Sequence, residues 1–374
     1  MNIKKLIFIF FLLIISLYFY NKFRFVNEEI NTNLPLISRP LTIPLKYKWD
    51  LMDLNKNENL EEVYNFLKNN YLESGTYNIE YSKDLLKNTL NDYTSIALRK
   101  KSNNKIIGFI SRIMRKVNMY DKIIDMFEID FLSVDKKERN KYIAPLLIKE
   151  MERLCNYENK WARALFIINK PIPKYNLVTS FPGYIRPINI KKLMRANIID
   201  YNYKYKYSFE DYKSNFKLEE LKESDIPACV FLLNKFCKQN FEIFYIYNNK
   251  SFKKQYFDSN DVKSFVVRDS NGNITDFISY FISVYKSSSE INLKYATLNC
   301  YFNFKNDLKY LVIQSIIKAK KDNCDYMIAS GLGNYKKFLD YCDFTKIYSS
   351  ANLYTFNWMV SQTDTNKVFI NFIG

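Results

Sequence analysis

The sequence predicts an α/β protein made of two tandem units of one kind, each a mixed twisted sheet with helices. Two observations lead to this fold class. Residues 128–154 read as an apolar strand that runs through a basic loop into an amphipathic helix. The chain also repeats itself at an offset of 169 residues, from Ser95 to Ser264.

The junction at residues 128–154 has the pattern of a phosphate-binding turn. Arg139 and Lys141 precede Ala144, so cationic side chains and the free amides of a helix start can converge on a pyrophosphate. The helix is predicted from apolar residues three to four positions apart, and Pro145 fits its first turn. Those apolar residues are Ile143, Leu146, Leu147, Met151 and Leu154. The alternative interpretation is an ordinary solvated helix start.

The repeat predicts that both halves contain the same β-hairpin and the same order of helices. Residues 95–111 and 264–279 both read as β-hairpins, with short β-branched runs around a polar turn. Residues 63–73 match 230–242, and Leu147 matches Ile316. The second copy carries a single Lys at residues 306–310, so one phosphate site is expected, in the first half.

Composition narrows the classes of partner. The chain has 374 residues, 48% of them hydrophobic, which suits two folded domains. The net charge of +17 favours an anionic partner. Nucleic acid is not expected, because the basic residues are dispersed and no zinc-finger or RNA-binding signature is present. The Tyr-rich residues 201–207 are interpreted as a hairpin edge, with a base-stacking platform as the alternative.

Cysteine and histidine usage limits the chemistry. The six cysteines form no C-x-x-C pair, so they are interpreted as reduced, buried thiols and no metal is expected. The chain has no His, which removes every Ser-His and Cys-His nucleophile. A proton acceptor must then be a carboxylate, Lys, Tyr, Cys or a chain terminus.

The N-terminus predicts a membrane anchor. Leu6 to Tyr20 is an uninterrupted apolar run between basic residues, although a span typically needs about 20 residues. An uncleaved single-pass anchor over residues 1–25 is preferred to a cleaved signal peptide, because bulky aromatic residues follow the run. Residues 26–45, with three prolines, are predicted to form an extended arm.

The stretch that begins at Glu128 resembles the signature of the N-myristoyltransferase family. Weaker similar stretches elsewhere in the chain occur in the same order as in that family. These stretches are residues 44–54, 60–73, 170–174, 274–281, 293–296 and 353–358. The resemblance implies two GNAT-like halves, at 46–200 for myristoyl-CoA and at 201–374 for a peptide with N-terminal glycine. It further implies a transferase that moves a fatty acyl group, expected to be myristoyl, from CoA to that glycine amine by direct attack.

The resemblance also assigns site residues. The amides of Phe131 and Leu132 would form the oxyanion hole, and the C-terminal carboxylate of Gly374 would be the base. The residues that would line the cofactor or wrap its phosphates are Phe131, Leu132, Ser133, Val134, Arg139, Asn140, Lys141, Tyr142, Ile143 and Ala144. Asp130 stands where the family usually has Asn, and Ile167 where it has Thr. Taken alone, Asp130 and Asp135 read as solvated charges at the ends of a strand.

Two functions of different classes remain at this point. The first is an active, membrane-tethered transferase, expected to be a monomer with its catalytic part facing the cytosol. The second is a catalytically degenerate module that binds acyl-CoA or a lipopeptide. The sequence leaves peptide specificity and acyl chain length open.

Overall fold

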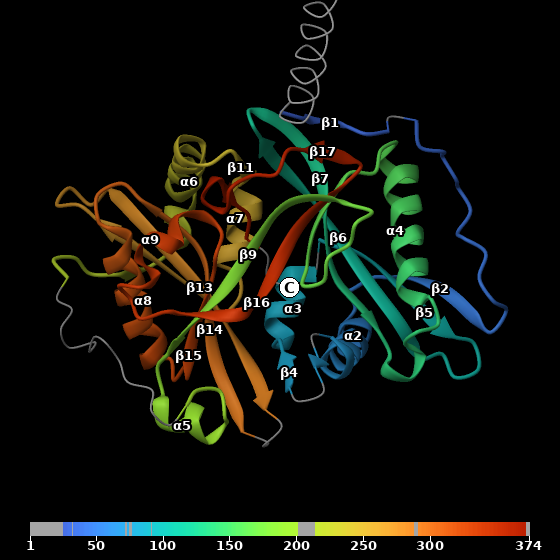
Figure 1. The fold of residues 1–374 in the computed structure, drawn as a ribbon, viewed down its shortest axis with the longest axis horizontal. Helices are drawn as coiled ribbons and strands as arrows, with labels where there is room; N and C mark the ends of the chain where they lie inside the picture. Colours follow the sequence, from blue (N-terminus) through green and yellow to red (C-terminus); the bar gives the residue numbers. More distant parts are fainter. Residues whose placement is uncertain are drawn as a thin grey trace, which may run out of the picture.

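One mixed sheet runs through both halves of the molecule, and helices cover it in each half (Figure 1). The computed structural model describes residues 25–371 apart from 32, 72, 75–76, 91, 201–213 and 288–290. In the first half the elements are β1 (Asn27–Glu29), β2 (Tyr47–Met52), α2 (Asn57–Asn70), β3 (Glu73–Ser74), β4 (Tyr77–Glu80), α3 (Lys83–Leu90), β5 (Thr94–Lys100), β6 (Ile106–Met119), β7 (Lys122–Val134), the 3-10 helix η1 (Lys136–Glu138), α4 (Ile143–Asn159), β8 (Ala164–Ile168), β9 (Asn176–Pro187) and α5 (Ile190–Arg195).

The second half repeats the order of the first. Its elements are β10 (Glu219–Glu220), η3 (Glu223–Asp225), α6 (Ile226–Asn240), β11 (Ile243–Ile246), α7 (Asn249–Tyr256), β12 (Val262–Arg268), β13 (Ile274–Ser287), β14 (Asn292–Asn303), α8 (Leu308–Lys321), β15 (Tyr326–Ser330), η4 (Gly333–Tyr335), α9 (Lys336–Leu339), β16 (Thr345–Phe356), β17 (Trp358–Val360), η5 (Thr365–Lys367) and β18 (Val368–Phe369).

The repeat predicted from the sequence is confirmed. The hairpins are β5 with β6 and β12 with β13, and both are antiparallel. In each half a third strand follows antiparallel, and a helix then carries the chain to a fourth, parallel strand, as such a crossover requires. Within the sheet the order β12-β13-β14-β15 is mirrored by β8-β7-β6-β5. The predicted fold class, two tandem GNAT-like units, is therefore correct.

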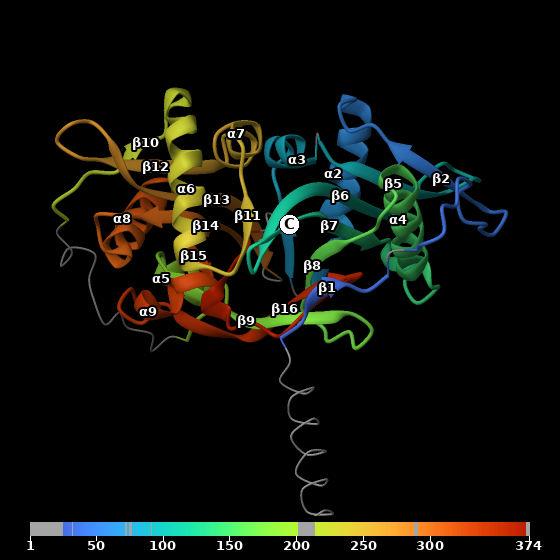
Figure 2. The ribbon, with the colours of Figure 1, turned by 90° about the horizontal axis from the view of Figure 1, so that it is seen from above.

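Two long strands join the halves at the centre of the sheet. β9 pairs with β15 of the second half and with β16, and β16 in turn pairs with β8 of the first half. Figure 2 shows both strands crossing between the halves, with α6 over one half and α4 over the other. A second junction forms where β11 pairs with β6 on one side and with β18 on the other.

The largest hydrophobic core belongs to both halves at once. It contains buried residues of β6 and β7, such as Val117 and Met126, together with side chains of α6, β13 and β18. Burial of this shared apolar surface is the main force that holds the halves together. The six cysteines are all buried thiols, as predicted, and burial raises the pKa of Cys155 to about 11.

The arm at residues 33–44 follows α4 along its outer side. Glu150 Oε2 accepts a hydrogen bond from the amide of Leu41 at 2.9 Å, and Arg153 Nη1 donates to the carbonyl of Ile37 at 2.8 Å. Asn156 Nδ2 donates to the carbonyl of Pro35 at 2.8 Å. Backbone groups without a ladder partner are thus satisfied by polar side chains of the helix.

The predicted membrane anchor is wrong on the structural findings. Among the described parts of residues 25–371, no helix has the length and apolar character needed to cross a bilayer. The apolar run from Leu6 to Tyr20, on which the prediction rested, lies outside the described residues, as does the Tyr-rich stretch at 201–207. The expected single-pass topology, with its catalytic part facing the cytosol, is withdrawn.

Candidate active site

A bulge interrupts the pairing of β6 with β7 where the site residues begin. Phe109 pairs with Ser133 and Ser111 with Asp130, so Phe131 and Leu132 lie opposite the single residue Ile110. Phe131 has a φ of 54°, in the left-handed region that non-glycine residues seldom adopt. Such a bulge turns the backbone amides of the extra residues out of the ladder.

Aromatic packing holds this backbone conformation in place. The Phe131 side chain is 1% exposed, and its ring lies 5.3 Å from the ring of Tyr71 and 6.0 Å from that of Tyr81. Tyr71 follows the end of α2, and Tyr81 precedes α3. The two helices therefore fix the bulge from the face of the sheet opposite α4.

Asp130 is a buried partner of the bulge, so its interpretation as a solvated charge is wrong. Its side chain is 8% exposed, and Oδ1 accepts from the Phe131 amide at 2.7 Å and from the Tyr71 hydroxyl at 3.1 Å. Burial first and then the charge of Asp130 raise the pKa of Tyr71 well above its usual value. Asp135, by contrast, caps η1 by accepting from the amide of Lys137 at 2.8 Å.

An apolar cavity of about 250 Å³ opens beside the bulge, between β7, α4 and β8. Phe131 and Leu132 lie in its wall, as does Asp130. The other lining residues are Tyr71, Ile110, Ile129, Ile148, Met151, Glu152, Cys155, Ala162, Arg163, Ala164, Phe166, Ile167, Ile168, Tyr175 and Phe356. A mainly apolar cavity of this size can accept a hydrocarbon chain.

The basic turn leads from the end of β7 into α4. Asn140 and Tyr142 have φ values of 64° and 59°, in the left-handed region, and left-handed residues in a turn can direct backbone amides towards an anion. Tyr142 itself is 84% exposed, whereas Ile143 is buried and starts α4. Ala144 follows in the first turn, so the amides of Ile143 and Ala144 lie at the helix start, where backbone donors lack intrahelical partners.

The two cations of the turn are anchored by partners that the sequence did not reveal. Arg139 donates to the carbonyl of Asn70 at 3.1 Å and to that of Val134 at 3.4 Å. Lys141 Nζ lies 3.0 Å from Glu138 Oε2, and Lys100 pairs with the same carboxylate. Hydrogen bonds from Lys100 and then Lys141 lower the pKa of Glu138 to about 2.

Ser133 and Val134 complete β7 between the bulge and the turn. Ser133 is 4% exposed, and its Oγ has no hydrogen-bond partner among the described residues. Val134 pairs with Gly108 of β6. The structure thus brings residues 130–134 and 139–144 together along one strand end and one helix start.

The last predicted site residue, Gly374, lies outside the described residues. The chain before it is well packed: Phe369 and Ile370 are 2% and 3% exposed. The carbonyl of Asn371 accepts from Gln255 Nε2 of α7 at 3.4 Å. The tail therefore enters the interior of the molecule before its last three residues.

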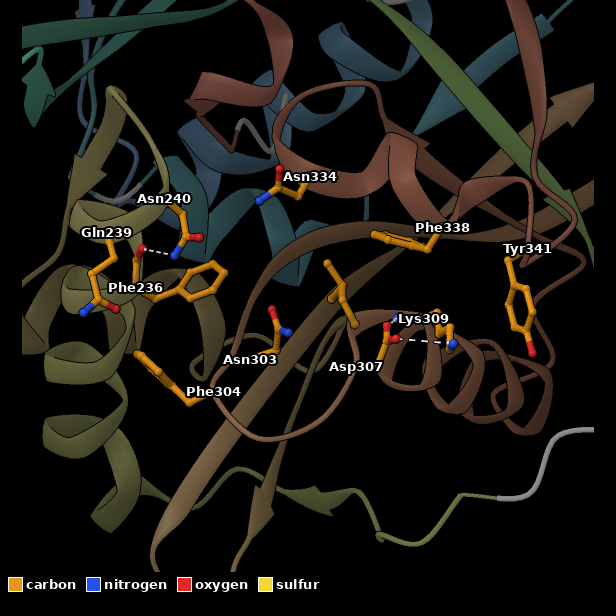
Figure 3. Close-up of a pocket in the computed structure, with 11 residues that line it drawn as sticks. Phe236, Gln239, Asn240, Asn303, Phe304, Asp307, Lys309, Asn334, Phe338 and Tyr341 are labelled. Atoms are coloured by element: carbon orange, nitrogen blue, oxygen red, sulfur yellow. Dashed lines mark hydrogen bonds and ion pairs between the residues drawn. The ribbon is translucent and has the colours of Figure 1, made fainter.

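A second cavity lies in the other half of the molecule, at the start of α8, the helix that corresponds to α4. It measures about 660 Å³ and lies between the end of α6, the start of α8 and α9 (Figure 3). Asp307 caps α8 by accepting from the amide of Lys309 at 3.0 Å, and its other oxygen lies 3.3 Å from Lys309 Nζ. An anion at this helix start would meet the carboxylate of Asp307.

The fold consists of two tandem units, and in the first a bulged strand runs through a basic turn into a helix. This arrangement places the protein in the GNAT-like class of acyl-CoA N-acyltransferases. Two family models match the chain: the N-terminal domain of myristoyl-CoA:protein N-myristoyltransferase over residues 28–176, and its C-terminal domain over 191–370. The chain belongs to this family.

Named relatives and a solved structure agree with the family assignment. The chain is 29% identical to the glycylpeptide N-tetradecanoyltransferase of Candida albicans over 90% of this chain and 81% of the relative. It is also 29% identical to that of Plasmodium falciparum, over 92% and 90% of the two chains. The fold matches Saccharomyces cerevisiae N-myristoyltransferase with bound myristoyl-CoA at a TM-score of 0.82 and 23% identity, covering 93% of this chain and 95% of that one.

Proposed function

We propose that this protein transfers a myristoyl group from myristoyl-CoA to the amino group of an N-terminal glycine. Membership in the family supports this activity, and one observation in the structure of this chain supports it further. The bulge at Phe131 and Leu132 borders the apolar cavity, and from the bulge β7 runs on into the basic turn that leads to α4. In an acyl-CoA the thioester carbonyl likewise stands between the acyl chain and the phosphates, so one acyl-CoA suits all three features.

In the proposed mechanism the glycine amine attacks the thioester carbonyl directly. The carbonyl oxygen lies against the amides of Phe131 and Leu132, and donors of this kind are typically worth a few kcal/mol to the transition state. The C–N bond forms and the C–S bond breaks, so no covalent enzyme intermediate arises. Arg139, Lys141 and the helix-start amides hold the phosphates and so position the thioester.

The carboxylate of Gly374 acts as a base in this reaction. An α-amino group has a pKa of about 8, so a carboxylate next to the amine suffices to take a proton as the bond forms. Deletion of Gly374 should therefore abolish turnover while it leaves the affinity for myristoyl-CoA unchanged. Unchanged turnover after the deletion would remove this carboxylate from the mechanism.

The decisive experiment measures acyl transfer by the full chain. A clickable myristoyl-CoA analogue is offered to a panel of peptides that begin with glycine, with the same peptides beginning with alanine as controls. We expect labelled product from glycine peptides only. Binding of the analogue with no transfer to any peptide would instead identify a catalytically inactive binding module.

The phosphate contacts are tested by neutralising the turn. Because charge-assisted hydrogen bonds contribute about 1.5 to 3 kcal/mol each, Arg139→Gln and Lys141→Gln should each weaken myristoyl-CoA binding roughly tenfold to a hundredfold in calorimetry. Lys116→Gln on β6, where the side chain is 55% exposed beside Asp125, is the matched control. Equal affinity of all three variants would refute the turn as the phosphate site.

A further inference from the structure

We propose that the cavity between α6, α8 and α9 is a second ligand site of this protein, and that its ligand is an uncharged purine nucleoside. The site goes beyond the proposed function, because none of the residues assigned to acyl-CoA or to the glycine amine lines it. The class of ligand follows from four features of the cavity: its size, its amide side chains, an accessible aromatic ring and a carboxylate.

The size of the cavity suits a small molecule. Its volume of about 660 Å³ lies within the range of roughly 300 to 1,000 Å³ that is usual for ligand sites. Figure 3 shows side chains of α6 on one side of the cavity and the start of α8 on the other, with Asn303 and Phe304 below and Asn334 above. All of these segments belong to the second half of the chain, so the cavity is separate from the acyl-CoA site of the first half.

The aromatic side of the cavity is held in shape by packing. Phe236, which lines the cavity, is 4% exposed, and its ring lies 5.6 Å from that of Tyr301 and 5.9 Å from that of Phe241. The ring of Phe304 meets the ring of Phe236 edge to face at 5.9 Å. This wall is therefore formed before a ligand binds, which lowers the entropic cost of binding.

Four side-chain amides border the cavity and keep hydrogen-bonding groups available. Within the described part of the chain, the side chains of Gln239 and Asn334 form no hydrogen bond. Asn240 and Asn303 each donate to one backbone carbonyl, at 2.8 and 3.0 Å, and their side-chain oxygens accept from none of the described residues. An amide presents a donor and an acceptor side by side, a pair that matches N6 and N7 of adenine.

These polar walls disfavour other classes of ligand. A hydrocarbon chain would displace water from the amides without replacing its hydrogen bonds, which is costly. An anion would need a cation without a partner, whereas Lys309, the cation that lines the cavity, lies 3.3 Å from Asp307 Oδ2. The walls therefore favour an uncharged ligand that is rich in donors and acceptors.

The ring of Phe304 favours a base over a free sugar. Phe304 is 42% exposed although Lys235 Nζ lies 5.6 Å from the centre of its ring, so part of this lining side chain stays accessible to a flat ligand. Bases of every kind stack on aromatic rings, because each base has a π face. Asn303 is the preceding residue, so a purine stacked on Phe304 has an amide near its edge.

Asp307 offers an acceptor for the ribose. One oxygen caps α8 by accepting from the Lys309 amide at 3.0 Å, and the side chain remains 54% exposed. A carboxylate in the first turn region of such a site can accept from the 2′ hydroxyl of a ribose, as the acidic residue of dinucleotide-binding folds does. It repels a phosphate, so the ligand is a nucleoside and not a nucleotide. The ribose of CoA carries phosphate, and Asp307 disfavours it for the same reason.

Calorimetry on the full chain tests the site. Adenosine is titrated into protein that is saturated with myristoyl-CoA, so that the site in the first half is already filled. We expect one adenosine to bind per chain. Phe304→Leu keeps an apolar side chain but removes the flat ring, and it should weaken adenosine binding roughly fivefold to a hundredfold. Phe231→Leu on α6, where the side chain is 66% exposed and does not line the cavity, is the matched control and should bind adenosine as wild type does.

The carboxylate is tested by changing ligand and protein together. Wild type should bind 2′-deoxyadenosine roughly tenfold more weakly than adenosine, because a hydrogen bond to a charged group is lost. Asp307→Ser keeps an oxygen that can cap α8 but has no carboxylate. This variant should therefore bind the two nucleosides with nearly equal affinity.

Four results would overturn the proposal. They are no binding of adenosine at millimolar concentration, equal adenosine affinity of wild type and Phe304→Leu, a preference for adenosine that survives in Asp307→Ser, and binding of glucose without binding of adenosine. Each leaves the proposed function standing, because acyl transfer to glycine peptides is measured separately and both variants should keep the wild-type rate. A wild-type chain that binds adenosine as expected but transfers no acyl group would refute the proposed function alone.

Discussion

At the scale of single residues, Gly108 sets how closely α4 can lie on β6. A Cβ atom added there would lie 2.8 Å from Leu147 Cδ1 and 2.9 Å from Ile143 Cγ2, both on the first turns of α4. Gly108→Ala should therefore push the helix start outward, at a cost of about 1 to 3 kcal/mol in the free energy of unfolding. Myristoyl-CoA affinity should fall as well, because the basic turn ends at Ile143.

Urea unfolding and calorimetry check both effects. Gly183→Ala on β9 is the matched control, since the nearest atom to an added Cβ there is Ile347 Cδ1 at 3.5 Å, an ordinary contact distance. Gly183→Ala should change neither quantity by a measurable amount. A Gly108→Ala protein with wild-type stability and affinity would show that α4 tolerates displacement.

The sequence indicated which residues lie at the site, but it did not indicate which other side chains they contact. Arg139 and Lys141 could be read as phosphate ligands because they lie at a strand-to-helix junction. The left-handed backbone of Phe131 has no such signature, because a bulge at a non-glycine residue depends on packing from α2 and α3. Asp130 was misjudged for the same reason: Tyr71, which buries it, lies 59 residues away in the sequence.

At the scale of elements, the turn between β7 and α4 is fastened by one carboxylate. Glu138 is 5% exposed and pairs with Lys100 of β5 and with Lys141. Its pKa is lowered to about 2 in the folded state, so its contribution to stability is complete above the unfolded-state value near 4.5. That contribution is lost as the pH falls from about 4.5 towards 2.

This linkage predicts an acid-sensitive turn. Between about pH 6 and pH 4, wild type should lose more free energy of unfolding than Glu138→Gln, which has no proton to gain at this position. Urea titrations at the two pH values measure the difference. Glu58→Gln, which removes an exposed carboxylate from the first turn of α2, should lose as much as wild type. Equal losses for wild type and Glu138→Gln would contradict the linkage.

The elements that could be predicted are those with a local pattern. The strand, turn and helix of residues 128–154 follow from apolar periodicity, and the hairpins follow from β-branched runs around polar turns. The sequences of β9 and β16 contain no comparable pattern that indicates which strands they pair with. Their pairing across the two halves depends on strands more than a hundred residues away, which a single sequence does not reveal.

At the scale of the whole molecule, the two halves share sheet and core and should unfold as one unit. β9 and β16 lie between β15 and β8, and β11 of the second half pairs with β6 of the first. Separation of the halves would expose long strand edges and the apolar core they share. A repeat in sequence therefore does not imply two independently stable domains in this fold.

A substitution at the second junction tests this cooperativity. Ile243 of β11 is fully buried and pairs with Met119 of β6 and Val368 of β18. Ile243→Ala should lower the free energy of unfolding by about 2 to 5 kcal/mol, through loss of buried surface and the cavity it leaves.

Hydrogen exchange of the variant in mild denaturant, read by mass spectrometry, should show β5 and β12 losing protection together. Ile123→Ala on β7, where the side chain is 63% exposed, should leave both strands protected. Rapid exchange of β12 while β5 stays protected would mean that the halves unfold separately, and the shared sheet would then be a contact between two domains rather than the core of one.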